Sequence, residues 1–245
     1  MMKSLQKFIL FFGITLTIAA CQNKQKKQET LAVDTLVHQT EVPQQVQPTN
    51  SDPVFPGTGN TITDFVPANY KMDLEATGDL NNDGEKDAVI VLINTRDTTA
   101  LRPTLVLLKQ GEKYNLYSKS LSVIGPKYRE DGYPVCDYEN VGIDSGKLVI
   151  SMQSTGPAGS IESIYKYIDK ALVLTQINAF SMGAGGQTDQ KIDLLKGTYT
   201  QTDINTMKEA MPSTTKTKTY KIPTVLFKDS DPSEIMMKAF DQVGN

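Results

Sequence analysis

Short apolar segments separated by brief polar turns recur along this chain from residue 70 to about residue 180. Residues 70–77 alternate apolar and polar side chains with a period of two, which is typical of a strand with one buried face. Residues 88–93 (AVIVLI) are continuously apolar and mostly β-branched, as expected for a strand buried on both faces. This pattern predicts a mainly β fold.

Three further turn sequences separate pairs of predicted strands. The turns are 110–112, 144–147 and 169–170, and the flanking strands are 101–109 and 114–118, 139–143 and 148–153, and 161–168 and 172–180. Strands joined by such short polar turns are typical of β-hairpins. Successive hairpins predict a compact antiparallel β-sheet meander, arranged as a sandwich or as an open barrel-like sheet.

An acidic loop, residues 79–87, lies between the first two predicted strands. The candidate metal ligands are the side chains of Asp79, Asn81, Asp83 and Asp87 and the backbone carbonyl of Glu85. Gly84 permits a sharp turn, so these oxygens can face one concavity, and hard oxygen ligands suit calcium. The sequence therefore predicts a structural Ca2+ ion. The alternative is an Asn, Asp and Gly turn that binds nothing.

The ligand spacing matches the first part of an EF-hand loop, but Ile90 occupies the position of the bidentate glutamate and no helix is predicted before the loop. The segment GDLNNDGEKDAVIVL instead resembles the calcium loop of FG-GAP or VCBS-type repeats, with the pattern D-x-[DN]-x-D-G-x-x-D. This resemblance implies that the five residues named above coordinate the ion. A propeller needs several such blades and the loop occurs once, so the chain is more similar to single-loop VCBS-like bacterial lipoproteins.

The N-terminal residues have the features of an export signal. Lys3 and Lys7 precede an apolar stretch, FILFFGITLTI, that ends in Ala19-Ala20-Cys21. The stretch is shorter than the roughly 20 residues that a membrane-spanning helix needs. Residues 18–21 (IAAC) resemble the bacterial lipobox, which implies cleavage before Cys21 and a lipid on its sulfur. An ordinary signal peptide cut near Ala20 is the alternative.

Charge and residue types exclude several classes of site. The signal contains two lysines and no acid, so its removal takes the formal net charge from −3 to −5, which argues against a nucleic-acid partner. His38, the single histidine, falls in a polar segment rich in Gln, Lys, Thr and Pro. A histidine-based catalytic or zinc site is therefore not expected. Cys136 has no partner if Cys21 is acylated, and we expect a small buried hydrophobe rather than a nucleophile.

Four segments are expected. They are a lipoprotein signal peptide (1–20), a lipidated cysteine with a flexible linker (21–60), an antiparallel β domain with the calcium loop (61–200), and a C-terminal appendage with short helices (201–245). Within the appendage, Thr202-Asp203 predicts the start of a helix ending near Met211. A second helix is expected to open at Asp231-Pro232 and run to Gln242.

Two functional classes follow from these observations. The first is a lipid-anchored protein of the bacterial cell envelope, not an enzyme, whose calcium-stabilised β domain binds an unknown protein or glycan or has a structural role. The second is an envelope hydrolase acting on glycan or peptidoglycan, which requires two carboxylates facing one cleft. The carboxylates of residues 79–87 would be the first candidates, but they are expected to point into one ion site. Glu139 and Asp144 are a separate pair, and nothing in the sequence favours them. The lipid anchor is expected in the outer membrane.

Overall fold

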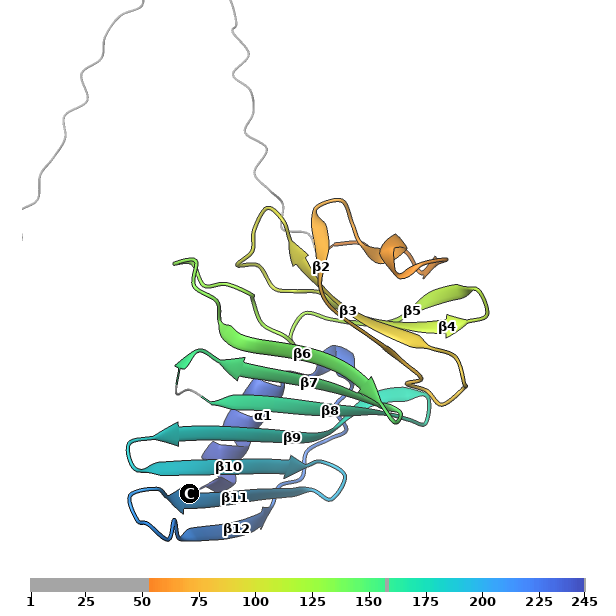
Figure 1. Ribbon diagram of the computed structural model, residues 1–245. Coiled ribbons are helices and arrows are strands. Elements are labelled where there is room, and N and C mark those ends of the chain that lie inside the picture. Colours follow the sequence, from red (N-terminus) through yellow and green to blue (C-terminus); the bar gives the residue numbers. More distant parts are fainter. Residues whose placement is uncertain (1–52, 157–158, 245) are drawn as a thin grey trace, which may run out of the picture. The chain divides into compact units, whose positions relative to one another are not determined.

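A computed structural model describes residues 53–156 and 159–244. It contains a five-stranded and a seven-stranded sheet, all of whose paired strands are antiparallel, and one short α-helix near the C-terminus (Figure 1). The body is sandwich-like and is not closed into a barrel. The predicted mainly β meander with C-terminal helical structure is confirmed.

The five-stranded sheet has the strand order β1-β5-β4-β3-β2. Its strands are β1 (Thr58–Gly59), β2 (Tyr70–Gly78), β3 (Asp87–Asn94), β4 (Thr104–Gln110) and β5 (Lys113–Ser120), and a 3-10 helix, η1 (Ile62–Phe65), follows β1. Residues 53–60, expected in the linker, thus contribute a strand to the sheet. The aromatic ring of Phe55 also packs against its core.

The seven-stranded sheet is a simple meander in which each strand pairs with the next along the chain. Its strands are β6 (Cys136–Asp144), β7 (Lys147–Ser154), β8 (Ser160–Ile168), β9 (Ala171–Gly183), β10 (Gly186–Asp193), β11 (Thr198–Asn205) and β12 (Ser213–Thr219). The predicted hairpins at 144–147 and 169–170 are confirmed. Ser145, Gly146, Asp169 and Lys170 all have positive φ, as tight hairpin turns require.

Strand β3 is buried on both faces, which explains its continuously apolar sequence. Val89 and Val91 face the main core, which also contains Ile150 of β7 and Tyr165 of β8. On the opposite face, Ile90 and its neighbours form a second core with Phe65 of η1 and with β4. The run 88–93 therefore lies between the other sheet and the η1 segment, as its composition predicts.

The segment after residue 200 is part of the folded body. The helix predicted from residue 202 to Met211 is wrong, because β11 runs through Asn205 with a paired strand on each side. Threonine-rich strands favour such pairing, and two neighbours override a local helix-start signal. The last helix is confirmed as α1 (Pro232–Ala239), capped by Asp231, whose carboxylate accepts the Glu234 N–H at 2.9 Å.

Helix α1 lies across one face of the seven-stranded sheet (Figure 1). Met236 and Ala239 pack into the main core, and a π-helical turn, η4 (Phe240–Gly244), replaces the last predicted turn of the α-helix. A second 3-10 turn, η3 (Phe227–Asp229), places Phe227 in the same core. In the part of the chain that the structure describes, no helix has the length and apolar character needed to span a membrane.

Candidate functional site

The acidic loop joins β2 to β3 and brings three of the predicted ligands together. The N–H of Asp83 donates to Asp79 Oδ1 at 3.1 Å and to Asn81 Oδ1 at 3.0 Å. The second oxygen of Asp79 accepts the Gly84 N–H at 2.9 Å, and Asn81 Nδ2 donates to Asp83 Oδ2 at 2.8 Å. The side chains of Asp79, Asn81 and Asp83 therefore lie next to one another in the loop, as the spacing predicts.

The backbone of the loop turns sharply at two residues. Asn82 and Gly84 have φ values of 62° and 89°. Only glycine and, less readily, asparagine or aspartate adopt this left-handed region without strain. The sequence thus places tolerant residue types at both positions, and the predicted sharp turn at Gly84 is confirmed.

The carboxylate of Glu85 is directed out of the loop. Both of its oxygens accept the Gly111 N–H, each at 3.0 Å, in the turn between β4 and β5. Glu85 was expected to serve the loop through its backbone carbonyl, and this arrangement of its side chain is compatible with that role. The carboxylate instead ties the loop to a neighbouring hairpin.

Asp87 is fully buried and binds backbone groups on two sides. Its Oδ2 accepts the Leu80 N–H and its Oδ1 accepts the Lys109 N–H, both at 2.9 Å. Burial raises the pKa of Asp87 and nearby Asp83 adds to the increase, although the backbone hydrogen bonds oppose it. Asp87 was predicted as a ligand, and the structure shows that both of its oxygens already hold the loop against β4.

Replacing Asp87 with asparagine should therefore destabilise the fold. An amide keeps one acceptor but turns an NH2 group toward the other backbone N–H, so one buried donor loses its partner. The free energy of unfolding should fall by about 1–3 kcal/mol, measured by urea denaturation of the full chain. Asp97→Asn is the matched control on an exposed turn. Equal stabilities of Asp87→Asn and this control would contradict the assigned role.

The loop is anchored to both sheets. Leu80 is fully buried in the main core. Asn82 lies against the β6–β7 turn, where a Cβ atom on Gly146 would be only 2.9 Å from Asn82 Oδ1. The order of this loop therefore affects how the two sheets pack.

The described residues include no group of three or more His, Cys, Asp or Glu side chains arranged to hold a metal ion. In the loop, two carboxylates and one amide converge, from Asp79, Asp83 and Asn81. Amide and carboxylate oxygens are both suitable calcium ligands, and affinity falls as the number of charged ligands decreases. The donor set fits a weakly bound calcium ion rather than a tightly held one.

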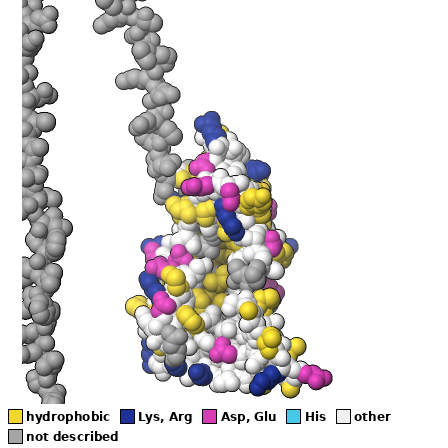
Figure 2. All heavy atoms as spheres, turned by 90° about the vertical axis from the view of Figure 1, so that its left-hand side faces the viewer, with side chains coloured by type: hydrophobic (Ala, Val, Ile, Leu, Met, Phe, Trp, Pro, Cys, Tyr) yellow, Lys and Arg dark blue, Asp and Glu magenta, His cyan; other side chains and the backbone are white. Residues whose placement is uncertain are grey.

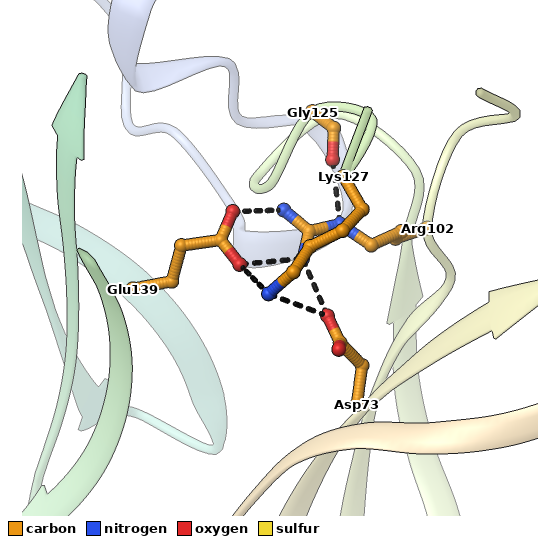
Figure 3. A network of polar contacts seen from close by, with 5 residues as sticks. All are labelled: Asp73, Arg102, Gly125, Lys127 and Glu139. Atoms are coloured by element: carbon orange, nitrogen blue, oxygen red, sulfur yellow. Dashed lines mark hydrogen bonds and ion pairs between the residues drawn. The ribbon is translucent and has the colours of Figure 1, made fainter. Parts of the chain in front are cut away.

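The candidate acid pair for hydrolysis does not face one cleft. Glu139 and Asp144 lie five residues apart on β6, and side chains an odd number apart point to opposite faces of a strand. The carboxylate of Glu139 is instead part of an ion network that the sequence did not predict (Figure 3).

The centre of this network is the fully buried guanidinium of Arg102. It donates two hydrogen bonds to Glu139, at 2.7 and 2.9 Å, one to Asp73 at 2.6 Å and one to the Gly125 carbonyl at 2.8 Å. Lys127 also contacts both carboxylates. Two positive and two negative groups thus join β2, β6, the segment between β3 and β4, and the segment between β5 and β6.

The network favours the charged forms of Glu139, Arg102 and Lys127. Burial would raise the pKa of Glu139, but hydrogen bonds and charge attraction from Arg102 and Lys127 outweigh it and lower that pKa. Burial opposes the charge of Arg102 and of Lys127 as well, yet the acidic partners raise both pKa values. An ionised Glu139 is unsuited to act as a general acid near neutral pH.

A groove of about 670 Å³ lies between α1 and the inner face of the seven-stranded sheet, the face that carries core residues such as Ile177 and Ile192. Its volume is in the range of small-molecule binding sites. Figure 2 shows the side of the molecule that is on the left in Figure 1, where β9 ends and β10 begins. Hydrophobic side chains gather in a recess on this side.

The floor of the groove was not predicted from the sequence, although the period-two pattern of its strands indicates it. Along β10, Thr188 and Gln190 share the inner face with buried Ile192, and along β11, Gln201 and Asp203 share it with buried Tyr199. Period-two positions that change from apolar to polar indicate the point at which the core ends. The segment from residue 202 was predicted to be helical, which hid this periodicity.

The remaining candidate residues lie partly outside the described residues. Cys21, predicted as the lipidation site, and His38 are both in that part of the chain. Cys136, expected to be a buried hydrophobe, is half-buried on β6 and has a free thiol. Burial is the main cause that raises the pKa of this thiol, which disfavours the nucleophilic thiolate.

Comparison with known proteins identifies no relative: no protein-family model, curated protein or solved structure matches this chain. The similarity of residues 79–87 to the FG-GAP or VCBS calcium loop therefore stays a prediction. What the loop and the groove can bind follows from their own donor atoms and geometry.

Proposed function

We propose that this protein is a membrane-anchored lipoprotein of the bacterial cell envelope whose calcium-stabilised β body has a binding role. The convergence of Asp79, Asn81 and Asp83 at the junction of β2 and β3 is the observation that carries the proposal. The lipobox-like residues 18–21 support the anchor, and the groove beside α1 supports binding rather than a purely structural role. The ion-paired state of Glu139 supports a non-catalytic role over a glycan hydrolase.

Calcium would be held by the side chains of Asp79, Asn81 and Asp83 and by the Glu85 carbonyl. Asp87 would act from behind the loop by fixing the Leu80 and Lys109 N–H groups. The ion would offset the repulsion between Asp79 and Asp83, and so would order a loop that contacts both sheets. Its contribution is structural.

The expected gain in stability is modest and measurable. Extracellular calcium modules bind with dissociation constants of about 10⁻⁴ to 10⁻³ M. At about 1 mM calcium, binding to the folded state alone would add on the order of 1 kcal/mol. For a body of this size, such a gain raises the melting temperature by about 2–4 °C.

Calorimetric melting of the full chain in detergent, with calcium and with chelator, tests this proposal. The parent should melt higher in calcium, and Asp83→Ala should melt equally in both. Asp131→Ala is the matched control, because both aspartates are exposed and both accept the N–H two residues later, at 2.8 Å for Asp83 and 3.1 Å for Asp131. Asp131→Ala should retain the calcium shift. Equal melting temperatures of the parent in calcium and in chelator would show that calcium does not stabilise the fold.

A further inference from the structure

The inner face of the seven-stranded sheet is covered along only part of its length. At the end of β11 that carries Tyr199, the side chains of the inner face are buried in the main core, together with residues of α1 and η3. Toward the other end of the same strand, Gln201 is half-buried and Asp203 is exposed. Polar side chains therefore replace the core where the cover ends, and the groove occupies this space.

The groove floor is a continuous chain of hydrogen bonds between side chains. Gln190 Nε2 donates to the Tyr199 hydroxyl at 2.7 Å, and that hydroxyl donates to Gln201 Oε1 at 2.8 Å. Gln201 Nε2 and Thr188 Oγ1 then donate to Asp203 Oδ1, at 3.0 and 3.1 Å. The buried tyrosine thereby orients two amides and a carboxylate on the open floor, which limits the entropy lost when a ligand binds.

The wall opposite this floor is apolar. Met236 is buried, whereas Met237 and Phe240 on the same helical segment are 60% and 39% exposed. A bound molecule would thus meet hydrogen-bonding groups on one side and hydrocarbon on the other. This combination suits a ligand with one polar and one apolar face.

The charge of the groove restricts the ligand further. Asp203 is the only charged side chain among the described residues that line it. An anionic ligand would meet one negative charge and no cation, and burial of an unpaired charge is unfavourable. The ligand should therefore carry no negative charge.

A peptide that adds a strand does not fit this place. Strands β10 and β11 form the floor, and both are hydrogen-bonded to neighbouring strands on each side. Their backbone groups are not available for strand addition, which needs a free sheet edge. Recognition has to come from side chains, here amides and a carboxylate that accept and donate hydrogen bonds next to one another.

We propose that this groove binds an uncharged oligosaccharide. Sugar hydroxyls both donate and accept hydrogen bonds, which matches the amides of Gln190 and Gln201 and the carboxylate of Asp203. The C–H face of a sugar ring would pack on Phe240 and Met237. This inference rests on the binding role proposed above and specifies its ligand class.

Calorimetric titration of the full chain tests the ligand class. The probes are neutral oligosaccharides of hexose and of N-acetylhexosamine units, an oligogalacturonate as the anionic counterpart, and tetra-alanine as the peptide counterpart. A neutral saccharide should bind, and Asp203→Ala and Gln201→Ala should each weaken that binding roughly tenfold. Gln153→Ala, on the exposed outer face of β7, is the matched control and should bind as the parent does.

Each other outcome overturns the inference. No binding by any neutral saccharide, or binding of only the anionic or peptide probe, would reject the ligand class. Saccharide binding that survives both groove variants would reject the groove, and a thermal melt of Gln201→Ala separates a lost contact from a lost fold. The calcium shift and the lipid anchor have their own readouts, so they can stand or fail independently of this result.

Discussion

Replacement of Arg102 by methionine should lower the free energy of unfolding by about 3–5 kcal/mol. The side chain of Arg102 is fully buried, and its partner Glu139 is only 3% exposed. Removing the guanidinium leaves the Glu139 carboxylate and the Gly125 carbonyl without their strongest donor. Lys127 cannot replace the lost donor at both groups, since it contacts only one oxygen of Glu139.

The position of the network explains why this effect should be large. Asp73 is on β2, in the five-stranded sheet, and Glu139 is on β6, in the seven-stranded sheet. The bonds of Arg102 therefore cross between the sheets at their adjoining edges (Figure 3). A buried charge left in this place weakens the packing of one sheet on the other.

Urea denaturation of Arg102→Met and of Arg96→Met, an exposed control, measures the difference. Glu139 has a lowered pKa in the folded parent, so its stabilising contribution is present above the unfolded pKa of about 4.5 and is lost as pH falls through the folded value. The difference in the free energy of unfolding between the parent and Arg102→Met should therefore become smaller at acidic pH. A loss similar to that of Arg96→Met at neutral pH would show that the network is not stabilising.

The second large effect concerns the proposed membrane anchor. Cys21→Ala should abolish incorporation of an alkyne fatty acid when the chain is expressed in a bacterium that processes lipoproteins. The reason is chemical, because the lipid needs a sulfur atom to form its thioether. A lipid anchor contributes about 0.8 kcal/mol per buried methylene, and two or more chains hold a protein stably.

Cys136→Ala is the natural control, since the chain contains two cysteines. It removes the other thiol and should leave the fatty acid label and the membrane fraction unchanged. Label that persists in Cys21→Ala but disappears in Cys136→Ala would show that the lipid is on Cys136 and not on Cys21. Label absent from the parent would contradict the anchor itself.

Much of the fold follows from local sequence patterns. The continuous run at 88–93 predicts a strand covered on both faces, and η1 and the seven-stranded sheet provide the two covers. Polar turn residues at 144–147 and 169–170 locate two hairpins, and Gly146 and Asp169 are residue types that tolerate the positive φ of tight turns. Asp231-Pro232 likewise locates the start of α1.

The errors arise where distant contacts decide the structure. The stretch from residue 202 has a helix-start signal, but its pairing with β10 and β12 makes it a strand. Arg102 can be buried only because carboxylates from β2 and β6 reach it. No local sequence pattern predicts such a network. The groove floor depends on the same unpredicted strand, so it was invisible until the sheet was known.

For the candidate site, spacing predicted that three of the four side chains lie together, but it did not predict the contacts of Asp87. Asp79, Asn81 and Asp83 are joined by hydrogen bonds, as their places at positions one, three and five of the loop suggest. Asp87 differs because a fully buried carboxylate needs donors, and the nearest are the Leu80 and Lys109 N–H groups. The contact with Lys109 depends on β4, which lies outside the loop sequence.

The intact mass of the mature protein isolated from bacterial membranes tests the proposed anchor. We expect a chain that begins at Cys21, with residues 1–20 removed and acyl groups on its N-terminal cysteine. A mature chain that begins at any other residue, or at Cys21 without a lipid, would contradict it.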